Sequence, residues 1–208
     1  MANFQIAFDN TDLELGHYFE ASKDDLVVFI NQNFQNPCIN EIPSQKCNCA
    51  YIDYIISLQN TSNFLFLAYS HGNTDRLIAN GEAYIRTGQN AHLFENSFFY
   101  SMSCLSAQVL GPALINEHNC LAFIGYNDES YAFDTAYKQL CIECDNFGIK
   151  KFIGGLNIGE AYNQMKDYFT FQVDILENAG EIIYAALLRK NRDCLVLIGD
   201  QNLLFNLF

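Results

Sequence analysis

The segment Phe64–Gly72 reads FLFLAYSHG, and the segment Ser97–Cys104 reads SFFYSMSC. Each begins with a mainly apolar run about as long as a strand and ends in small or polar residues. Apolar runs of this kind are typical of strands that are buried on both faces of a sheet. The two segments therefore predict core strands at Phe64–Tyr69 and Ser97–Met102, the first followed by a histidine and the second by a cysteine.

Strands and helices are expected to alternate around these two segments. Three further apolar runs predict strands, at Leu26–Ile30, Leu121–Tyr126 and Cys194–Ile198. Apolar residues at helical spacing predict helices at Ala50–Leu58, at Leu105–His118 and, two or three in number, across residues 130–192. The polar stretch Asn31–Cys49 holds two of the three prolines, and we expect it to be a long loop.

This alternation predicts one α/β domain over residues 1–208. Strands separated by helices form βαβ units with right-handed crossovers, so we expect a doubly wound parallel sheet with helices on both faces. In such sheets the chemistry gathers beyond the carboxyl ends of the strands. The residues that follow the predicted strands are therefore the first candidates for a functional site.

Composition narrows the function further. Eleven Lys and Arg against 24 Asp and Glu give a net charge of −13, and half of the residues are hydrophobic. That charge argues against binding to nucleic acid or to an anionic membrane surface, and the apolar content excludes wholesale disorder. We find neither a signal peptide nor an apolar run that could cross a bilayer, so we expect a cytoplasmic protein with reduced, mostly buried cysteines.

His71 and Cys104 are the candidate catalytic residues. The predicted helix that begins at Leu105 would place Cys104 at a helix N-terminus, where free N–H groups and the helix dipole favour a thiolate. His71 would accept the thiol proton and later protonate a leaving amine. The N–H groups of Gly72 and Cys104 would form an oxyanion hole. The alternative is structural: a loop histidine and a buried cysteine with no shared task.

The order of these motifs resembles the caspase-like cysteine peptidases of clan CD, especially CHAT, gingipain-like and separase-like enzymes. The segments FLFLAYSHG, FFYSMSCLSAQVLGPALI and CLAFIGYND carry the resemblance. CLVLIGDQNLLFNL resembles a Gly-Asp-Pro element of those families, with Gln201 in place of the proline. The resemblance implies a three-layer sandwich with a mostly parallel central sheet and a catalytic dyad of His71 and Cys104.

The resemblance also implies a preference for cleavage after a basic residue. In related enzymes an acidic residue near the position of Asp128 binds a basic P1 side chain, and Glu129 is its neighbour. The alternative is an exposed acidic turn. The chain departs from the family pattern in its short length, which leaves room for only a reduced hairpin in residues 73–96. It also departs in Pro112, which we expect to shorten or kink the helix after Cys104.

The function implied is that of a cytosolic cysteine endopeptidase that cleaves specific protein targets. The small size of the chain suggests that an activating or regulatory protein partner completes it, and the resemblance implies a role in bacterial defence or signalling. Two alternatives stay open: an inactive pseudoprotease that binds peptides or proteins, and a thiol amidase or acyltransferase that acts on small molecules. No nucleotide-binding motif is present and no cofactor is expected.

The remaining cysteines raise a zinc hypothesis. Cys38, Cys47 and Cys49 lie within twelve residues, and Cys141 and Cys144 form a second pair. Structural zinc sites prefer two pairs of ligands with at least two residues between the members of each pair. Cys47 and Cys49 are too close for that pattern, and cysteines three apart on a helix share one face. We therefore expect these thiols to pack in the core and to bind no metal.

Overall fold

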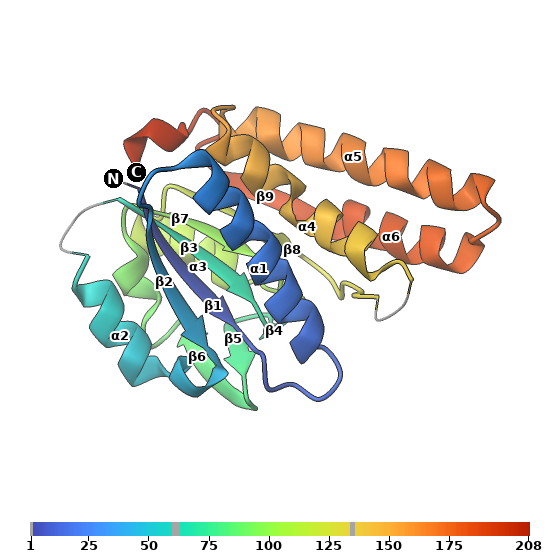
Figure 1. Ribbon diagram of the computed structural model, residues 1–208. Coiled ribbons are helices and arrows are strands. Elements are labelled where there is room, and N and C mark those ends of the chain that lie inside the picture. Colours follow the sequence, from blue (N-terminus) through green and yellow to red (C-terminus); the bar gives the residue numbers. More distant parts are fainter. Residues whose placement is uncertain (1, 60–62, 134–135) are drawn as a thin grey trace.

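A computed structural model describes residues 2–59, 63–133 and 136–208, and it has a six-stranded sheet at its centre (Figure 1). The strand order is β2-β1-β3-β7-β8-β9. The strands are β1 (Asn3–Phe8), β2 (Cys38–Pro43), β3 (Phe64–Tyr69), β7 (Ser97–Ser101), β8 (Ala122–Tyr126) and β9 (Leu195–Gly199). The predicted core strands β3 and β7 are confirmed, and they are neighbours in the sheet.

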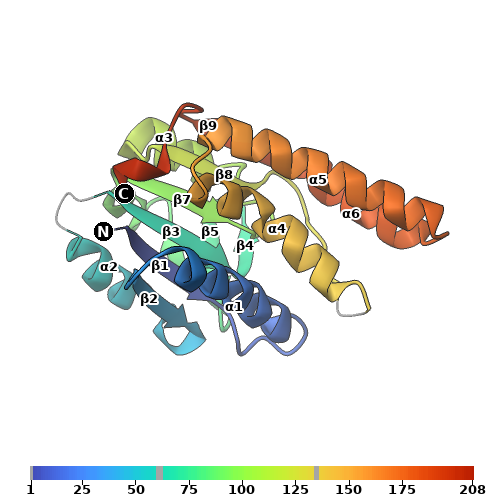
Figure 2. The ribbon, with the colours of Figure 1, turned by 45° about the horizontal axis from the view of Figure 1, so that its top comes forward.

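The sheet is parallel except for β9, which runs antiparallel to β8. Helix α5 (Ile158–Asn178) begins beside Gln201, just beyond the end of β9, and extends past the sheet (Figure 2). Helix α6 (Ile182–Cys194) runs back only as far as the edge where β8 ends, and there Leu195 pairs with Tyr126. β9 must therefore start at that edge, which makes it the antiparallel member of a mostly parallel sheet, as the family resemblance implies.

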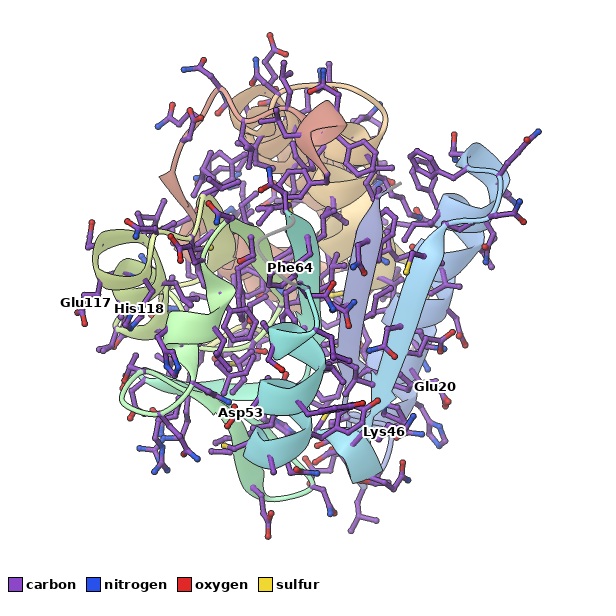
Figure 3. All side chains as sticks on the ribbon, turned by 90° about the vertical axis from the view of Figure 1, so that its left-hand side faces the viewer. Glu20, Lys46, Asp53, Phe64, Glu117 and His118 are labelled. Atoms are coloured by element: carbon purple, nitrogen blue, oxygen red, sulfur yellow. The ribbon has the colours of Figure 1, made fainter. Side chains whose placement is uncertain are left out.

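Helices cover both faces of the sheet, as expected. One face is covered by α1 (Gly16–Asn33), α4 (Lys138–Ile153), α5 and α6, and the other by α2 (Cys49–Ser57) and α3 (Leu110–His118). Side chains of β3 alternate between the two cores, with Leu65 and Leu67 in one and Phe64 and Phe66 in the other. In Figure 3, Phe64 lies inside while Glu20, Lys46 and Glu117 are spread over the surface.

The strand predicted at Leu26–Ile30 is in fact part of α1. Leu26 and Ile30 face the core while Val28, between them, is 54% exposed. This burial has the period of a helix. Leu26 and Ile30 extend the buried face of α1 that begins with Tyr18 and Phe19. A short apolar run does not distinguish a buried strand from one side of a helix, and here the longer periodic face determines the structure.

Two strands on one side of the sheet, β1 and the edge strand β2, were not predicted from the sequence. β1, NFQIAF, contains a buried polar residue, Gln5, which interrupts the apolar pattern. β2 lies within Asn31–Cys49, the stretch expected to be a loop, and it pairs with β1 as the outer strand. Edge strands face solvent on one side and are commonly short and polar, so β2 looks like a loop in the sequence.

The helix predicted to begin at Leu105 begins at Leu110 instead. Leu105 adopts a left-handed backbone conformation, φ 61°, which ends any helical path directly after Cys104. Pro112 then occupies the first turn of α3, where its missing N–H removes no intrahelical hydrogen bond. The proline accordingly belongs to the start of a helix that is shorter than predicted.

Residues 73–96 hold more structure than a reduced hairpin. A three-stranded antiparallel sheet is formed by β4 (His71–Asn73), β5 (Arg76–Ala79) and β6 (Glu82–Arg86). Its buried side chains Leu77, Tyr84 and Ile85 join the core beneath α2 and α3. Short 3-10 turns at Ser44–Lys46, Ala91–Phe94 and Phe205–Leu207 complete the described elements. No helix in the described part of the chain has the length and apolar character required to cross a membrane.

Candidate active site

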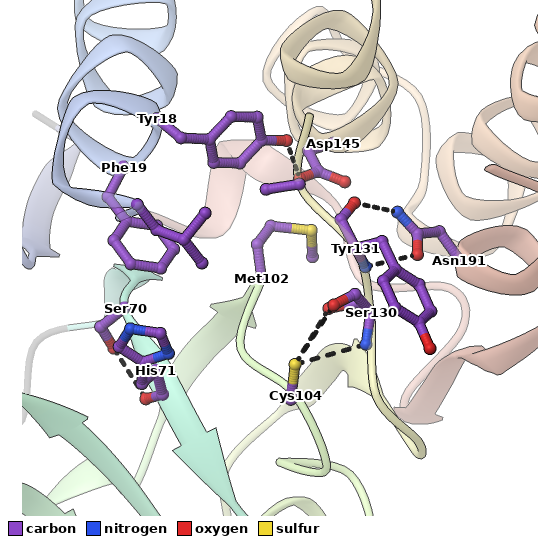
Figure 4. A pocket seen from close by; sticks show the side chains of 12 residues that line it. Tyr18, Phe19, Ser70, His71, Met102, Cys104, Ser130, Tyr131, Asp145 and Asn191 are labelled. Carbon is purple, nitrogen blue, oxygen red and sulfur yellow. Dashed lines mark hydrogen bonds between the residues drawn. The ribbon is translucent and has the colours of Figure 1, made fainter. Parts of the chain in front are cut away.

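A small cavity lies beyond the carboxyl ends of β3 and β7, where the sequence places its candidates. His71 and Cys104 both line it, together with Asp145 of α4 (Figure 4). It contains about 30 Å³ of space, enough for about two water molecules. Both predicted catalytic residues therefore face one cavity, because β3 and β7 are adjacent parallel strands that end at the same edge.

One ring nitrogen of His71 is held by a carboxylate. Nε2 of His71 lies 3.0 Å from Oδ2 of Asp12. The edge of the imidazole also packs against Phe19, with ring centroids 5.4 Å apart and the planes at 89°. A carboxylate accepts a proton but has none to donate, so Nε2 carries the hydrogen in the neutral ring and Nδ1 carries the lone pair. Nδ1 is then the nitrogen that can accept a proton.

Asp12 is a residue that the sequence analysis missed. Its Oδ1 accepts hydrogen bonds from the N–H groups of Glu14, at 2.9 Å, and Leu15, at 2.6 Å. Burial raises the pKa of Asp12, but the bonds from Leu15, His71 and Glu14 outweigh it and leave the pKa below its usual value. Asp12 follows β1, so recognition of that strand would have placed this carboxylate at the same edge of the sheet as His71 and Cys104.

Cys104 sits in a tight turn that packs against Gly72. A Cβ atom on Gly72 would lie 2.5 Å from the carbonyl oxygen of Cys104 and 2.8 Å from Cβ of Ser103. Only glycine permits this approach of the two backbones. Ser70 joins the same two segments, since its hydroxyl contacts those of Tyr84, at 2.8 Å, and Ser103, at 3.5 Å.

The helix dipole does not act on Cys104 as predicted. The N–H of Leu110, the first residue of α3, donates to the carbonyl of Thr74 at 2.8 Å, six residues after the cysteine. The thiol instead contacts Ser130: the Ser130 N–H donates to Sγ at 3.3 Å, and the two side chains lie 3.4 Å apart. Local hydrogen bonds, rather than a helix end, therefore surround this sulfur.

Asp145 is a second acidic residue that the sequence analysis missed. It is 5% exposed, and its carboxylate accepts hydrogen bonds from Tyr18, at 2.6 Å, and Tyr126, at 2.7 Å. Burial raises the pKa of Asp145 to about 6, against the opposing effect of the two tyrosine hydroxyls. It forms no ion pair with any described residue. A lone aspartate in the middle of a helix offers no sequence signal for such a role.

Asp128 and Glu129 do not line the cavity. Asp128 forms an ion pair with Lys190 of α6, and this contact lowers the pKa of Asp128. Glu129 is exposed. The main chain of this pair nevertheless lies close to Cys104, because the N–H of Leu105 donates to the carbonyl of Asp128 at 3.1 Å.

The other cysteines are dispersed. Cys47, Cys120, Cys141, Cys144 and Cys194 are buried, and burial raises the pKa of each of these thiols. Cys38 is exposed. Across the described residues, no three His, Cys, Asp or Glu side chains come together in a way that could hold a metal ion.

Comparison with known proteins identifies the architecture. The solved structure of the Arg-specific cysteine proteinase gingipain R matches 97% of this chain, with a TM-score of 0.65 and 14% sequence identity. The chain has the caspase-like fold. It spans about half of gingipain R, 47% of that chain. No family model matches the sequence, and no curated protein does.

The caspase-like fold confirms the expected α/β class and the structural resemblance to clan CD peptidases. At 14% identity the comparison establishes the fold alone. An assignment of chemistry therefore depends on the residues at the carboxyl edge of the sheet.

Proposed function

We propose that this protein is a cysteine endopeptidase in which Cys104 is the nucleophile and His71 the general acid and base. One observation carries the proposal: His71 and Cys104 line the same cavity, and Asp12 fixes the histidine so that Nδ1 can accept a proton. A nucleophile, a base and a group that orients the base form the usual machinery of covalent acyl transfer. Asp12 would act as a positioning residue through His71.

The proposed reaction begins with proton transfer from the Cys104 thiol to Nδ1 of His71. The sulfur attacks the peptide carbonyl, and the N–H groups of Gly72 and Cys104 stabilise the oxyanion. Collapse of this intermediate breaks the C–N bond, and His71 returns the proton to the leaving amine. Water, deprotonated by His71, then hydrolyses the thioester and releases the second product.

A basic P1 side chain is the preferred substrate feature in this proposal. Asp145 supports it, because a buried carboxylate that forms no ion pair with any described residue would be stabilised by a cation. Asp128 and Glu129 are the alternative carboxylates, outside the cavity but next to Cys104 through Leu105. Comparing Asp145→Asn with Asp128→Asn on Arg and Leu substrates distinguishes the two: the variant that loses selectivity for Arg identifies the residue.

The test of activity uses fluorogenic peptides with Arg, Lys, Asp or Leu at P1, and an electrophilic ketone with Arg at P1. Wild-type protein should cleave the Arg or Lys peptide and be labelled at Cys104. Cys104→Ala should lose both, while Cys38→Ala, which removes an exposed thiol in β2, should keep both. Wild-type protein that neither cleaves nor labels would instead support the pseudoprotease alternative.

The cellular setting of this activity is also a proposal. The cavity is too small for a peptide side chain. In this proposal an activating protein therefore opens the site, and the enzyme then cleaves specific targets inside the cell. Bacterial defence or signalling is the context implied by the resemblance. Labelling of Cys104 in cell extract, before and after an activating stress, would test whether activation increases access to the thiol.

A further inference from the structure

The segment Asn127–Tyr131, here called the strap, follows β8 and lies directly on Cys104. Three contacts join Ser130 to the cysteine: the Ser130 N–H donates to Sγ at 3.3 Å, Sγ lies 3.4 Å from the Ser130 hydroxyl, and the thiol points to the Ser130 carbonyl at 3.5 Å. The side of the sulfur that faces the strap is therefore occupied by protein.

The end of α6 holds the strap from the other side. Asn191 is 1% exposed, and its side chain binds the main chain of Tyr131 twice: Oδ1 accepts from the N–H at 2.8 Å, and Nδ2 donates to the carbonyl at 2.7 Å. The N–H of Asn127 also donates to the carbonyl of Cys194 at 2.8 Å. Asn191 therefore holds the strap through a buried side chain that binds both the N–H and the C=O of Tyr131.

The strap leaves little room for a substrate beside Cys104, although the thiol itself is partly exposed. The cavity beside His71 and Cys104 contains about 30 Å³, whereas sites for drug-sized ligands usually offer on the order of 300 Å³ or more. Ser130 and Tyr131 form one wall of that cavity (Figure 4). Outward movement of the strap would widen this space and give a peptide fuller access to the sulfur.

We propose that Asn191 is a latch that holds the strap against the partly exposed Cys104, so that release of its bonds to Tyr131 frees the side of the sulfur that Ser130 now occupies. The two bonds satisfy the buried side chain of Asn191, and breaking them is unfavourable unless water replaces the main chain of Tyr131. Loss of the side chain removes this restraint, because the main chain of Tyr131 then finds its partners in water by swinging outward. The ion pair between Lys190 and Asp128 is partly exposed and contributes little to the restraint.

The test measures the rate at which iodoacetamide alkylates Cys104, read from the mass of its proteolytic peptide. Asn191→Ala should raise that rate at least tenfold over wild type. Arg189→Ala is the matched control, because Arg189 lies on the same helix but pairs with Glu177, and its rate should stay within twofold of wild type. An unchanged or slower rate in Asn191→Ala overturns the latch.

Buried thiols elsewhere separate opening of the strap from unfolding. Cys47 and Cys120 lie in the core on the other face of the sheet, and a released latch leaves their slow alkylation unchanged. If Asn191→Ala unfolds, Asn191→Asp replaces it: the new carboxylate still accepts from the Tyr131 N–H but repels the Tyr131 carbonyl. Faster alkylation of Cys104 alone in either folded variant supports the latch, and equal rates in Asn191→Asp and wild type contradict it.

The inference assigns regulation to the proposed catalytic site, and its test does not depend on peptide cleavage. If no variant cleaves a peptide while Asn191→Ala speeds alkylation, the latch stands and the proposed function fails. If wild type cleaves peptides while alkylation is unaffected by Asn191, the proposed function stands and the latch fails.

Discussion

The backbone of Gly72 passes so close to Cys104 that no side chain fits between them. Gly72→Ala would place Cβ 2.5 Å from a main-chain oxygen, which cannot move without shifting the nucleophile. We expect a loss of about 1–3 kcal/mol in the free energy of unfolding, measured in urea, and a fall in alkylation of Cys104 by an Arg-directed ketone. Gly88→Ala is the control, since its Cβ would meet no atom within 4 Å. Equal losses in the two variants would contradict the close approach.

Asp12 determines which nitrogen of His71 carries the proton. In Asp12→Asn the amide still accepts from the Glu14 and Leu15 N–H groups, but its NH₂ now faces Nε2. Nε2 must then accept, so the hydrogen moves to Nδ1, which can no longer take the thiol proton. We expect kcat for the preferred peptide to fall on the order of 100-fold with little change in thermal stability.

The exposed neighbour Glu14 supplies the control for this prediction. Glu14→Gln removes a carboxylate from the same loop without touching His71, so its kcat should equal that of wild type. If Asp12→Asn is as active as Glu14→Gln, the carboxylate does not orient the histidine.

At the level of elements, substitution of Pro112 tests whether the helix after Cys104 begins at Leu110 or at Leu105. In α3 it stands in the first turn, so Pro112→Ala should change the free energy of unfolding by less than about 0.5 kcal/mol. A helix that began at Leu105 would hold the same proline in its interior, and the substitution would stabilise it by roughly 3 kcal/mol. Asn116→Pro, in the interior of α3, should lose about that amount in the same urea titration.

Strands that are buried on both faces were the elements that the sequence predicted well. β3, β7 and β8 are such strands, and His71 and Cys104 were found because they follow the first two. β1 is also buried, but Gln5 interrupts its apolar run, and β2 is a polar edge strand, so neither carried such a signal. Asp12 was missed together with β1. Asp145 and Asn191 reach the site from helices, and a single sequence does not show which helical residue faces which loop.

At the scale of the whole molecule, Asp145 connects several helices and strands through hydrogen bonds. Its carboxylate binds Tyr18 of α1 and Tyr126 of β8, and its main-chain carbonyl accepts from Tyr100 of β7 at 2.5 Å. One residue of α4 thereby connects the helical layer to two strands of the central sheet. Because that residue is a buried acid, the stability of the entire fold is linked to its protonation.

The sign of this linkage follows from the pKa of Asp145, which burial raises from 3.8 to about 6. Between about pH 4 and pH 6 the folded protein retains a proton that the unfolded chain has released, so rising pH lowers the free energy of unfolding. Relative to Asp145→Asn, which does not titrate, wild type should lose on the order of 3 kcal/mol from pH 4 to pH 7. Urea titrations of both proteins across that range measure the difference. A difference that is independent of pH would show that Asp145 is ionised in the folded protein throughout.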